Sequence, residues 1–207
     1  MRPLPRLHAI TDAEVLAVPD FGVRAAAIAA AGPSVALHAR DRTAGGAVLA
    51  RAAERLRALA RPPEAAVFVN ARPDVAAAVG AQGVQLAGDD LSPADARRVL
   101  GAGWIGCSVH SEEQARAAVA EGADFLLVGN VYQTPSHPGR TAAGLDLVRA
   151  AARLGRPVIA IGGIDAARVA EVRDAGAYGV AAIRALWGAA DPAAAALALL
   201  APWWDAA

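Results

Sequence analysis

Polar side chains follow nearly every short apolar run of this chain, and their types are suited to binding phosphate and moving protons. His38 lies in one run and His110 just beyond another, and imidazole exchanges protons near neutral pH. Arg40 can form charge-assisted hydrogen bonds with a phosphate. The other candidate side chains at the ends of runs are Asn70, Ser108, Asn130, Thr134 and Arg184. A catalytic or a hydrogen-bonded structural role is open for each histidine.

The run over 158–161 ends in Gly162-Gly163, and a helical pattern follows. Glycines at this point expose backbone N–H groups to a ligand, typically a phosphate. The alternative is a tight turn that needs glycine for its geometry alone. We expect a phosphate site here, to which Arg184 adds a charge unless it is a surface cation.

The acidic pair Asp89-Asp90 is the candidate site for a divalent cation, because hard cations take carboxylate oxygens. Neighbouring side chains diverge, however, and Asp90 or Ser92 is equally suited to cap the helix that follows. From these residues we expect no tight magnesium site.

The elements that position these residues alternate from one end of the chain to the other. Buried-strand patterns cover 7–11, 34–39, 66–70, 83–86, 104–108, 125–129, 158–161 and 179–183. Helical patterns cover 20–31, 46–61, 72–80, 92–101, 111–122, 143–154, 165–175 and 190–200. Eight βα units predict a single-domain (β/α)8 TIM barrel over residues 1–207, with an open doubly wound sheet as the alternative. In a barrel, the polar residues at the strand ends meet at one mouth.

Composition excludes several classes of function. Twenty basic and twenty acidic residues cancel, and without a basic stripe we expect no nucleic-acid partner. No apolar run is long enough to span a membrane, and the N-terminus lacks a signal-peptide pattern. The single cysteine, Cys107, excludes an intramolecular disulfide. We expect a cytoplasmic protein, and the sequence leaves open whether it forms a homo-oligomer.

Six motifs occur in an order and spacing that resemble one known family. They are residues 8–12 (HAITD), 69–70 (VN), 83–86 (GVQL) with Asp90, 105–111 (IGCSVHS), 128–134 (VGNVYQT) and 161–164 (IGGI). Together they resemble the thiamine phosphate synthase superfamily, nearly end to end. The resemblance implies a (β/α)8 barrel and a small phosphorylated thiazole ligand, whose phosphate lies at the last two strand ends.

The superfamily has two branches, and departures from the synthase pattern bear on the choice. Synthases join a pyrimidine pyrophosphate to thiazole phosphate with Mg²⁺, whereas TenI-like thiazole tautomerases transfer a proton without a metal. The synthase pattern Gln-x-Arg-x-Lys reads Ala36 to Arg40 here, and its Asn-Asp reads Asn70-Ala71. Its Thr-Lys after Thr134 is replaced by residues 135–137 (PSH).

We therefore predict a tautomerase without a cofactor. The alternatives are a synthase that uses Mg²⁺ with Asp90, and a non-catalytic phosphate-ligand binder. The tautomerase histidine is Asn130 here, and an amide cannot act as a general base. His38 or His110 is then the expected proton carrier, with Asn130 and Ser108 orienting the ring. Arg40, Asn70, Thr134, Gly162, Gly163 and Arg184 are the expected substrate- and phosphate-binding residues.

Overall fold

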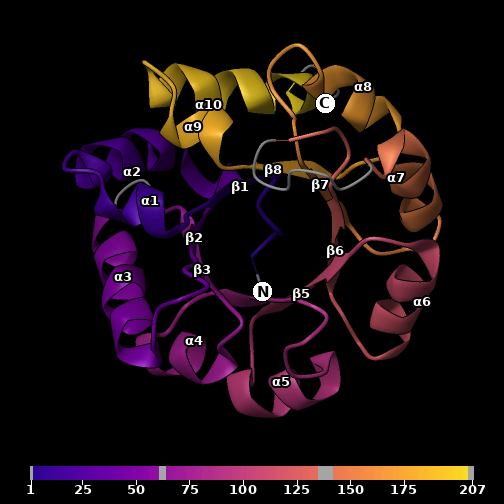
Figure 1. The fold of residues 1–207 in the computed structure, drawn as a ribbon, viewed down its shortest axis with the longest axis horizontal. Helices are drawn as coiled ribbons and strands as arrows, with labels where there is room; N and C mark the ends of the chain where they lie inside the picture. Colours follow the sequence, from indigo (N-terminus) through magenta and orange to yellow (C-terminus); the bar gives the residue numbers. More distant parts are fainter. Residues whose placement is uncertain (1, 61–63, 135–141, 205–207) are drawn as a thin grey trace.

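The computed structural model describes residues 2–60, 64–134 and 142–204 and shows eight parallel strands closed into a barrel (Figure 1). The strands are β1 (Leu7–Ile10), β2 (Val35–Ala39), β3 (Ala66–Asn70), β4 (Gly83–Leu86), β5 (Trp104–Val109), β6 (Phe125–Gly129), β7 (Val158–Ile161) and β8 (Gly179–Ala182). The helices are α1 (Ala13–Ala17), α2 (Phe21–Ala29), α3 (Gly46–Leu59), α4 (Pro73–Val79), α5 (Pro93–Leu100), α6 (Glu112–Ala120), α7 (Gly144–Ala152), α8 (Val169–Asp174), α9 (Arg184–Trp187) and α10 (Pro192–Leu200), with 3-10 turns η1 (Gly32–Ser34) and η2 (Ala201–Trp203).

The first and last strands pair with each other, which decides between the two predicted architectures. Leu7 is in register with Val180 on β8, so the sheet has no free edge. The (β/α)8 barrel is confirmed, and the open doubly wound sheet is wrong. That residues 1–207 all belong to one domain stays a prediction.

Alternation along each strand divides the buried side chains into two layers. One set packs between the strands and the helices around the barrel, which Figure 1 shows as a ring. The other set fills the barrel interior and includes Phe68, Phe125 and Ile159. His8 and His38 belong to the interior as well, because their rings contact Phe68. Residues at every second position of β2 and β3 therefore point into the barrel interior.

Helix starts follow the expected capping chemistry at two positions and depart from it at a third. Ser92 and Ser111 accept hydrogen bonds from the N–H groups of Asp95 and Gln114, as N-cap residues do. The helix predicted from residue 165 instead begins at Val169. The Asp165 carboxylate accepts from two backbone N–H groups of the intervening turn, at 3.0 and 3.1 Å.

Gly106 on β5 lies where the side chains of Phe125 and Gln85 occupy the space of a Cβ. An added Cβ would lie 2.1 Å from Phe125 Cζ and 2.4 Å from Gln85 Oε1. We expect Gly106→Ala to lower the free energy of unfolding by about 3 kcal/mol, because an interior filled from all eight strands cannot move apart. Urea unfolding measures this change. Gly88→Ala, which adds a Cβ with nothing within 4 Å, is the control; equal losses in both variants would contradict the packing argument.

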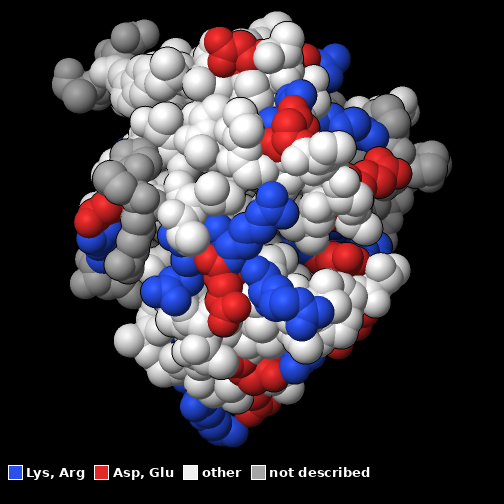
Figure 2. Space-filling model, turned by 90° about the vertical axis from the view of Figure 1, so that its left-hand side faces the viewer, with Lys and Arg blue, Asp and Glu red and all other residues white. Residues whose placement is uncertain are grey.

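The described surface carries both signs of charge close together. Figure 2 shows the side of the molecule on which α2 and α3 lie, with arginines gathered near its centre and acidic side chains between them. Here the Arg24 guanidinium pairs with Asp20, and that of Arg55 lies 4.8 Å from the Phe21 ring centroid. Within the described residues, no helix is long and apolar enough to cross a membrane.

Candidate functional site

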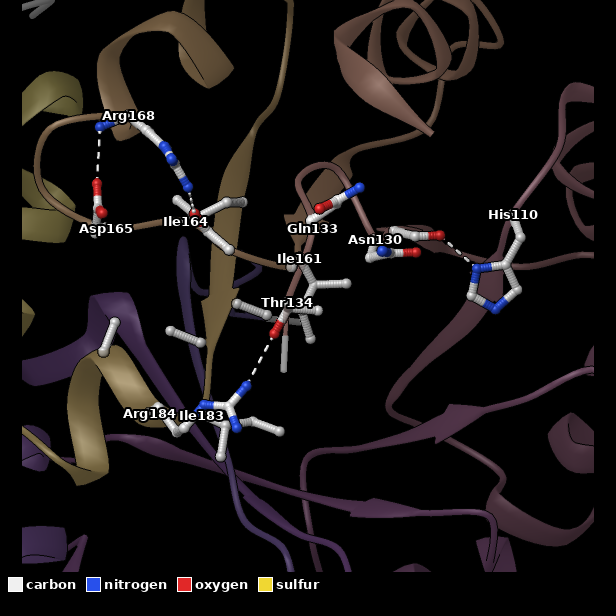
Figure 3. A pocket seen from close by; sticks show the side chains of 16 residues that line it. His110, Asn130, Gln133, Thr134, Ile161, Ile164, Asp165, Arg168, Ile183 and Arg184 are labelled. Atoms are coloured by element: carbon white, nitrogen blue, oxygen red, sulfur yellow. Dashed lines mark hydrogen bonds between the residues drawn. The ribbon is translucent and has the colours of Figure 1, made fainter. Parts of the chain in front are cut away.

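A cavity of about 360 Å³ opens at the carboxyl ends of β5 to β8 (Figure 3). Its lining combines backbone from two turns with polar side chains from four strand ends. The lining residues are His110, Gly129, Asn130, Gln133, Thr134, Ile161, Gly162, Gly163, Ile164, Asp165, Arg168, Ala181, Ala182, Ile183, Arg184 and Ala185. Six predicted site residues therefore meet at one place: His110, Asn130, Thr134, Gly162, Gly163 and Arg184.

The glycine turn after β7 is fixed by its backbone and by its neighbours. Gly162 has φ +105° and Gly163 has φ +66°, conformations that side chains with a Cβ rarely adopt. A Cβ on Gly162 would also lie 2.7 Å from Asn130 Cα. The turn and the segment after β6 are joined by hydrogen bonds from Val131 N to Ile161 O and from Tyr132 N to Gly162 O. Only glycine allows this close approach.

Two arginines border the cavity from different elements, as Figure 3 shows. Arg184, the first residue of α9, donates to Thr134 Oγ1 at 2.9 Å. Arg168 donates to the Gly163 carbonyl at 2.8 Å and lies 4.7 Å from the Tyr132 ring centroid. Guanidinium groups beside exposed backbone N–H groups form a site suited to a phosphate.

Sequence reasoning missed Arg168 and Asp165 as residues of this site. Arg168 lies within the helix predicted over 165–175, where its side chain is expected to be a surface cation. The available signal was its distance of five residues from Gly163, which is short enough for the side chain to return to the turn.

His110 and Asn130 occupy the side of the cavity nearest β5 and β6. His110 Nδ1 bonds to the Gly129 carbonyl, which can only accept, so this nitrogen carries the proton. Asn130 is 9% exposed, and its amide donates to the Tyr132 carbonyl at 3.4 Å.

The other predicted residues lie across the barrel mouth, on β2 to β5. Arg40 follows β2 directly, where the Thr11 hydroxyl accepts from its N–H group at 2.9 Å and shares its single hydrogen between the carbonyls of His38 and Arg40. Burial and then the neighbouring cation Arg42 lower the pKa of the Arg40 guanidinium, against the raising effects of Asp12 and Asp41. An anion bound beside Arg40 would relieve this repulsion.

Asn70 and Ser108 point inward from the strands on this side. Asn70 Oδ1 lies 3.0 Å from His38 Nδ1, and Ser108 Oγ accepts from Gln85 Nε2 at 3.1 Å. These residues and Arg40 are not among those that line the cavity. The structure thus divides the predicted site into two halves of one mouth.

His38 lies deeper than the other candidate side chains. Its ring is fully buried, stacks on Phe68 at 5.0 Å and bonds to His8 at 2.8 Å. Burial lowers the pKa of His38 from 6.5 to about 4, although its hydrogen bond to Asn70 acts in the opposite direction. At neutral pH the ring is uncharged and is separated from the cavity.

This lowered pKa predicts how stability depends on pH. Unfolded histidine has a pKa near 6.5, so between pH 6.5 and about 4 the unfolded chain binds the extra proton. Stability is therefore complete above pH 6.5 and falls as the pH drops through this window, by about 3 kcal/mol for His38. Urea unfolding at pH 7 and pH 4 measures the fall. His38→Gln removes the titrating group, and an equally steep fall in that variant would contradict the assignment.

Comparison with known proteins identifies the family. The family model for thiamine monophosphate synthase matches residues 7–186. The chain belongs to this family. It is 51% identical over 148 residues to the thiamine-phosphate synthase of Thermus thermophilus, covering 70% of this chain and 71% of that one. It is 47% identical over 162 residues to the thiamine-phosphate synthase of Mycolicibacterium vanbaalenii, covering 77% and 70%.

Solved structures agree with the fold of the thiamine monophosphate synthase family. The thiamine phosphate pyrophosphorylase from Pyrococcus furiosus superposes with a TM-score of 0.82 at 33% identity, covering 97% of this chain and 96% of that one. A 3-hexulose-6-phosphate synthase superposes with a TM-score of 0.67 at 24% identity, covering 95% and 99%, which shows the fold alone.

The prediction of a TenI-like tautomerase is wrong. The curated relatives described above are both named thiamine-phosphate synthase, which favours the synthase alternative. They indicate an enzyme, and the isomerase assignment has no support among them. His38 and His110 were expected to carry the proton in that reaction, so these two roles depend on the tautomerase assignment and are not proposed further.

The residues that depart from the synthase pattern of this family lie in both described and undescribed parts of the chain. Ala71 follows β3 in a left-handed conformation, φ +66°, and donates to the Gln85 carbonyl. Asp90 accepts from Ala87 N at 2.7 Å, which closes the turn after β4. Residues 135–137, which replace the expected Thr-Lys, lie outside the described residues.

Proposed function

We propose that the chain is a thiamine-phosphate synthase, a transferase that joins hydroxymethylpyrimidine pyrophosphate to thiazole phosphate. The observation that carries the proposal is the 51% identity to the synthase of Thermus thermophilus over 148 residues. The geometry supports it, because the mouth has two separate cationic regions. Arg184 and Arg168 border the cavity, and Arg40 directly follows β2, a strand four places away from β6 around the barrel.

The two regions suit the two substrates. The cavity over β5 to β8 has the glycine turn and two arginines, which fit the single phosphate of the thiazole substrate. Ile161 and Ile183 add apolar lining for the ring. Arg40, a partly buried cation beside a second cation, fits the larger charge of the pyrophosphate.

The reaction needs no general base at the point where the bond forms. The thiazole nitrogen has no proton, and its lone pair forms a C–N bond to the pyrimidine methylene carbon. The C–O bond to pyrophosphate breaks at the same carbon, and its electron pair leaves on the pyrophosphate oxygen. Arg40 stabilises the charge that develops there, while Asn130 orients the thiazole. An amide at position 130 is therefore compatible with this chemistry.

Magnesium would supply further neutralisation of the pyrophosphate when bound. Among the described residues, no three His, Cys, Asp or Glu side chains are grouped to hold a metal. Mg²⁺ is commonly held by one or two carboxylates together with substrate phosphates and water, so a preformed cluster is not required. The donor set fits an ion held mainly by pyrophosphate, with Asp90 as the carboxylate that this chain supplies.

Restoring the second acidic residue of the synthase pattern should strengthen this binding. Ala71→Asp places a carboxylate after β3, and aspartate tolerates the left-handed conformation found there, φ +66°. We expect the Mg²⁺ concentration for half-maximal activity to fall about tenfold, since a second charged ligand adds roughly 1.4 kcal/mol. Ala71→Asn, which matches the shape without the charge, is the control. An equal response of both variants would contradict the explanation.

Incubating the protein with both substrates and Mg²⁺ tests the proposed function directly. We expect thiamine phosphate and pyrophosphate to form in equal amounts, and chelation of the metal to reduce the rate. Binding of thiazole phosphate is measured in parallel by calorimetry. Binding without product formation in a fully folded preparation would overturn the synthase proposal.

A further inference from the structure

A row of hydrogen bonds crosses the barrel interior, from the amino ends of the strands to the mouth at their carboxyl ends. His8 Nε2 lies 3.0 Å from the Pro5 carbonyl, and His8 Nδ1 lies 2.8 Å from His38 Nε2. His38 Nδ1 lies 3.0 Å from Asn70 Oδ1. Both rings are fully buried, whereas Asn70 is the last residue of β3 and is partly exposed. The row therefore ends on a side chain that a ligand at the mouth can reach.

The Pro5 carbonyl gives this row a direction. A carbonyl oxygen can only accept a hydrogen bond. His8 Nε2 therefore carries a hydrogen and donates a hydrogen bond to the Pro5 carbonyl. If His8 is neutral, its Nδ1 is bare and accepts from His38 Nε2. If His38 is neutral as well, its own Nδ1 is bare. That nitrogen then needs a donor, and an amide oxygen cannot serve as one.

Two arrangements resolve the contact between His38 Nδ1 and the Asn70 amide. Either the histidine pair carries one extra proton, or the amide turns over and presents its nitrogen. Burial lowers the pKa of both rings and Arg40 lowers that of His38 further, although the contacts with Pro5 and Asn70 act in the opposite direction. Their other ring contacts are to Phe68 and Phe125, which supply no counter-charge. The amide fits either way round, because its nitrogen and oxygen are nearly equal in size.

We propose that the His8–His38 pair is a positioning device that fixes the Asn70 amide with its nitrogen toward His38 and its oxygen toward the barrel mouth. Asn70 then accepts hydrogen bonds from a ligand and donates none. The group that it recognises is a hydrogen-bond donor, such as an amino group on a heteroaromatic ring. Phosphate oxygens only accept hydrogen bonds, so they are bound by Arg40 and not by Asn70. The choice of ligand rests on the proposed function, whereas the orientation of the amide does not.

Nitrogen-15 NMR of the histidine rings tests the orientation in the ligand-free protein at pH 7. We expect both rings to be neutral with their protons on Nε2, and His38 Nδ1 to show the shift of a nitrogen that accepts a hydrogen bond. Asn70→Leu should move only this last signal, to that of an unbonded nitrogen. A proton on His38 Nδ1, or an imidazolium at either position, would overturn the proposal.

Variants of His8 test whether the pair controls recognition at the mouth. His8→Phe leaves His38 free to move its proton to Nδ1 and donate to Asn70 Oδ1, which turns the amide nitrogen outward. His8→Gln keeps a donor for Pro5 and an acceptor for His38, and so should preserve the tautomer. The NMR signals of His38 report both outcomes without any assay of activity.

The matching ligand experiment compares the KM of the aminopyrimidine pyrophosphate with that of an analogue in which a methyl group replaces the amino group. We expect about a tenfold preference for the amino form in wild type and in His8→Gln, and its loss in His8→Phe. An equal preference in all three would overturn the role in recognition. If no substrate reacts, the proposed function fails, while the NMR result still decides the orientation.

Discussion

Gly162→Ala is expected to lower kcat/KM for thiazole phosphate by about a hundredfold or more while the protein remains folded. The added Cβ would lie 2.6 Å from Asn130 Cβ and 2.7 Å from Asn130 Cα, and φ is +105°. Either the turn moves away from the segment after β6, or Asn130 moves. Both displace groups that line the cavity, and a shift of roughly 1 Å at a positioned group costs about two orders of magnitude in rate.

Gly155→Ala provides a matched control for this variant. Gly155 has φ +75°, so alanine is strained there too, but nothing lies within 4 Å of the added Cβ. We expect it to lose about 1 kcal/mol of stability and to keep full activity. Steady-state kinetics and urea unfolding of both variants separate strain from displacement. If Gly155→Ala lost activity as Gly162→Ala does, backbone strain alone would explain the effect, and the contact with Asn130 would not.

The strands could be predicted from the sequence because they are buried on both faces. Runs of apolar residues bounded by glycine and polar residues match β3, β4, β6 and β7 residue for residue. The segment before α8 could not, because its alanine-rich composition favours a helix. Its conformation depends on two tertiary contacts, Asp165 with its own turn and Arg168 with Gly163, which local propensity does not contain.

Six residues that line the cavity could be predicted from the sequence, whereas the depth of each candidate side chain could not. The period-two pattern predicts that residues 38 and 40 both point inward. Only the packing shows that His38 stacks on Phe68 within the interior while Arg40 lies beyond the strand. A histidine at an inward position therefore resembles a catalytic residue in sequence, although burial makes it a neutral structural element.

The wrong choice of branch has a chemical origin. Asn130, which cannot move a proton, spoke against a tautomerase, whereas bond formation by a thiazole nitrogen needs no base there. The missing carboxylate at Ala71 indicates the loss of a metal site, whereas Mg²⁺ is commonly held by substrate phosphates and water together with only one or two carboxylates. What the substrates contribute to a site is absent from the sequence of the protein.

Arg40→Met is expected to lower kcat/KM for the pyrimidine pyrophosphate by about two to three orders of magnitude. Its guanidinium is partly buried just after β2, and in the proposed function it stabilises the charge that develops on the leaving group. Methionine keeps the apolar stem, so packing beside Thr11 is preserved. The KM for thiazole phosphate should change less than twofold, because the site proposed for that ligand lies across the mouth.

Arg42→Met separates this specific role from the general effect of removing a positive charge. Arg42 is exposed and its cation lowers the pKa of the Arg40 guanidinium, so its removal relieves repulsion without removing a ligand. We expect activity close to that of wild type at physiological ionic strength, where exposed charges are screened. Equal losses in the two variants would mean that Arg40 acts only through the overall field. A loss confined to Arg40→Met, and mainly in kcat, would place its guanidinium on the leaving pyrophosphate.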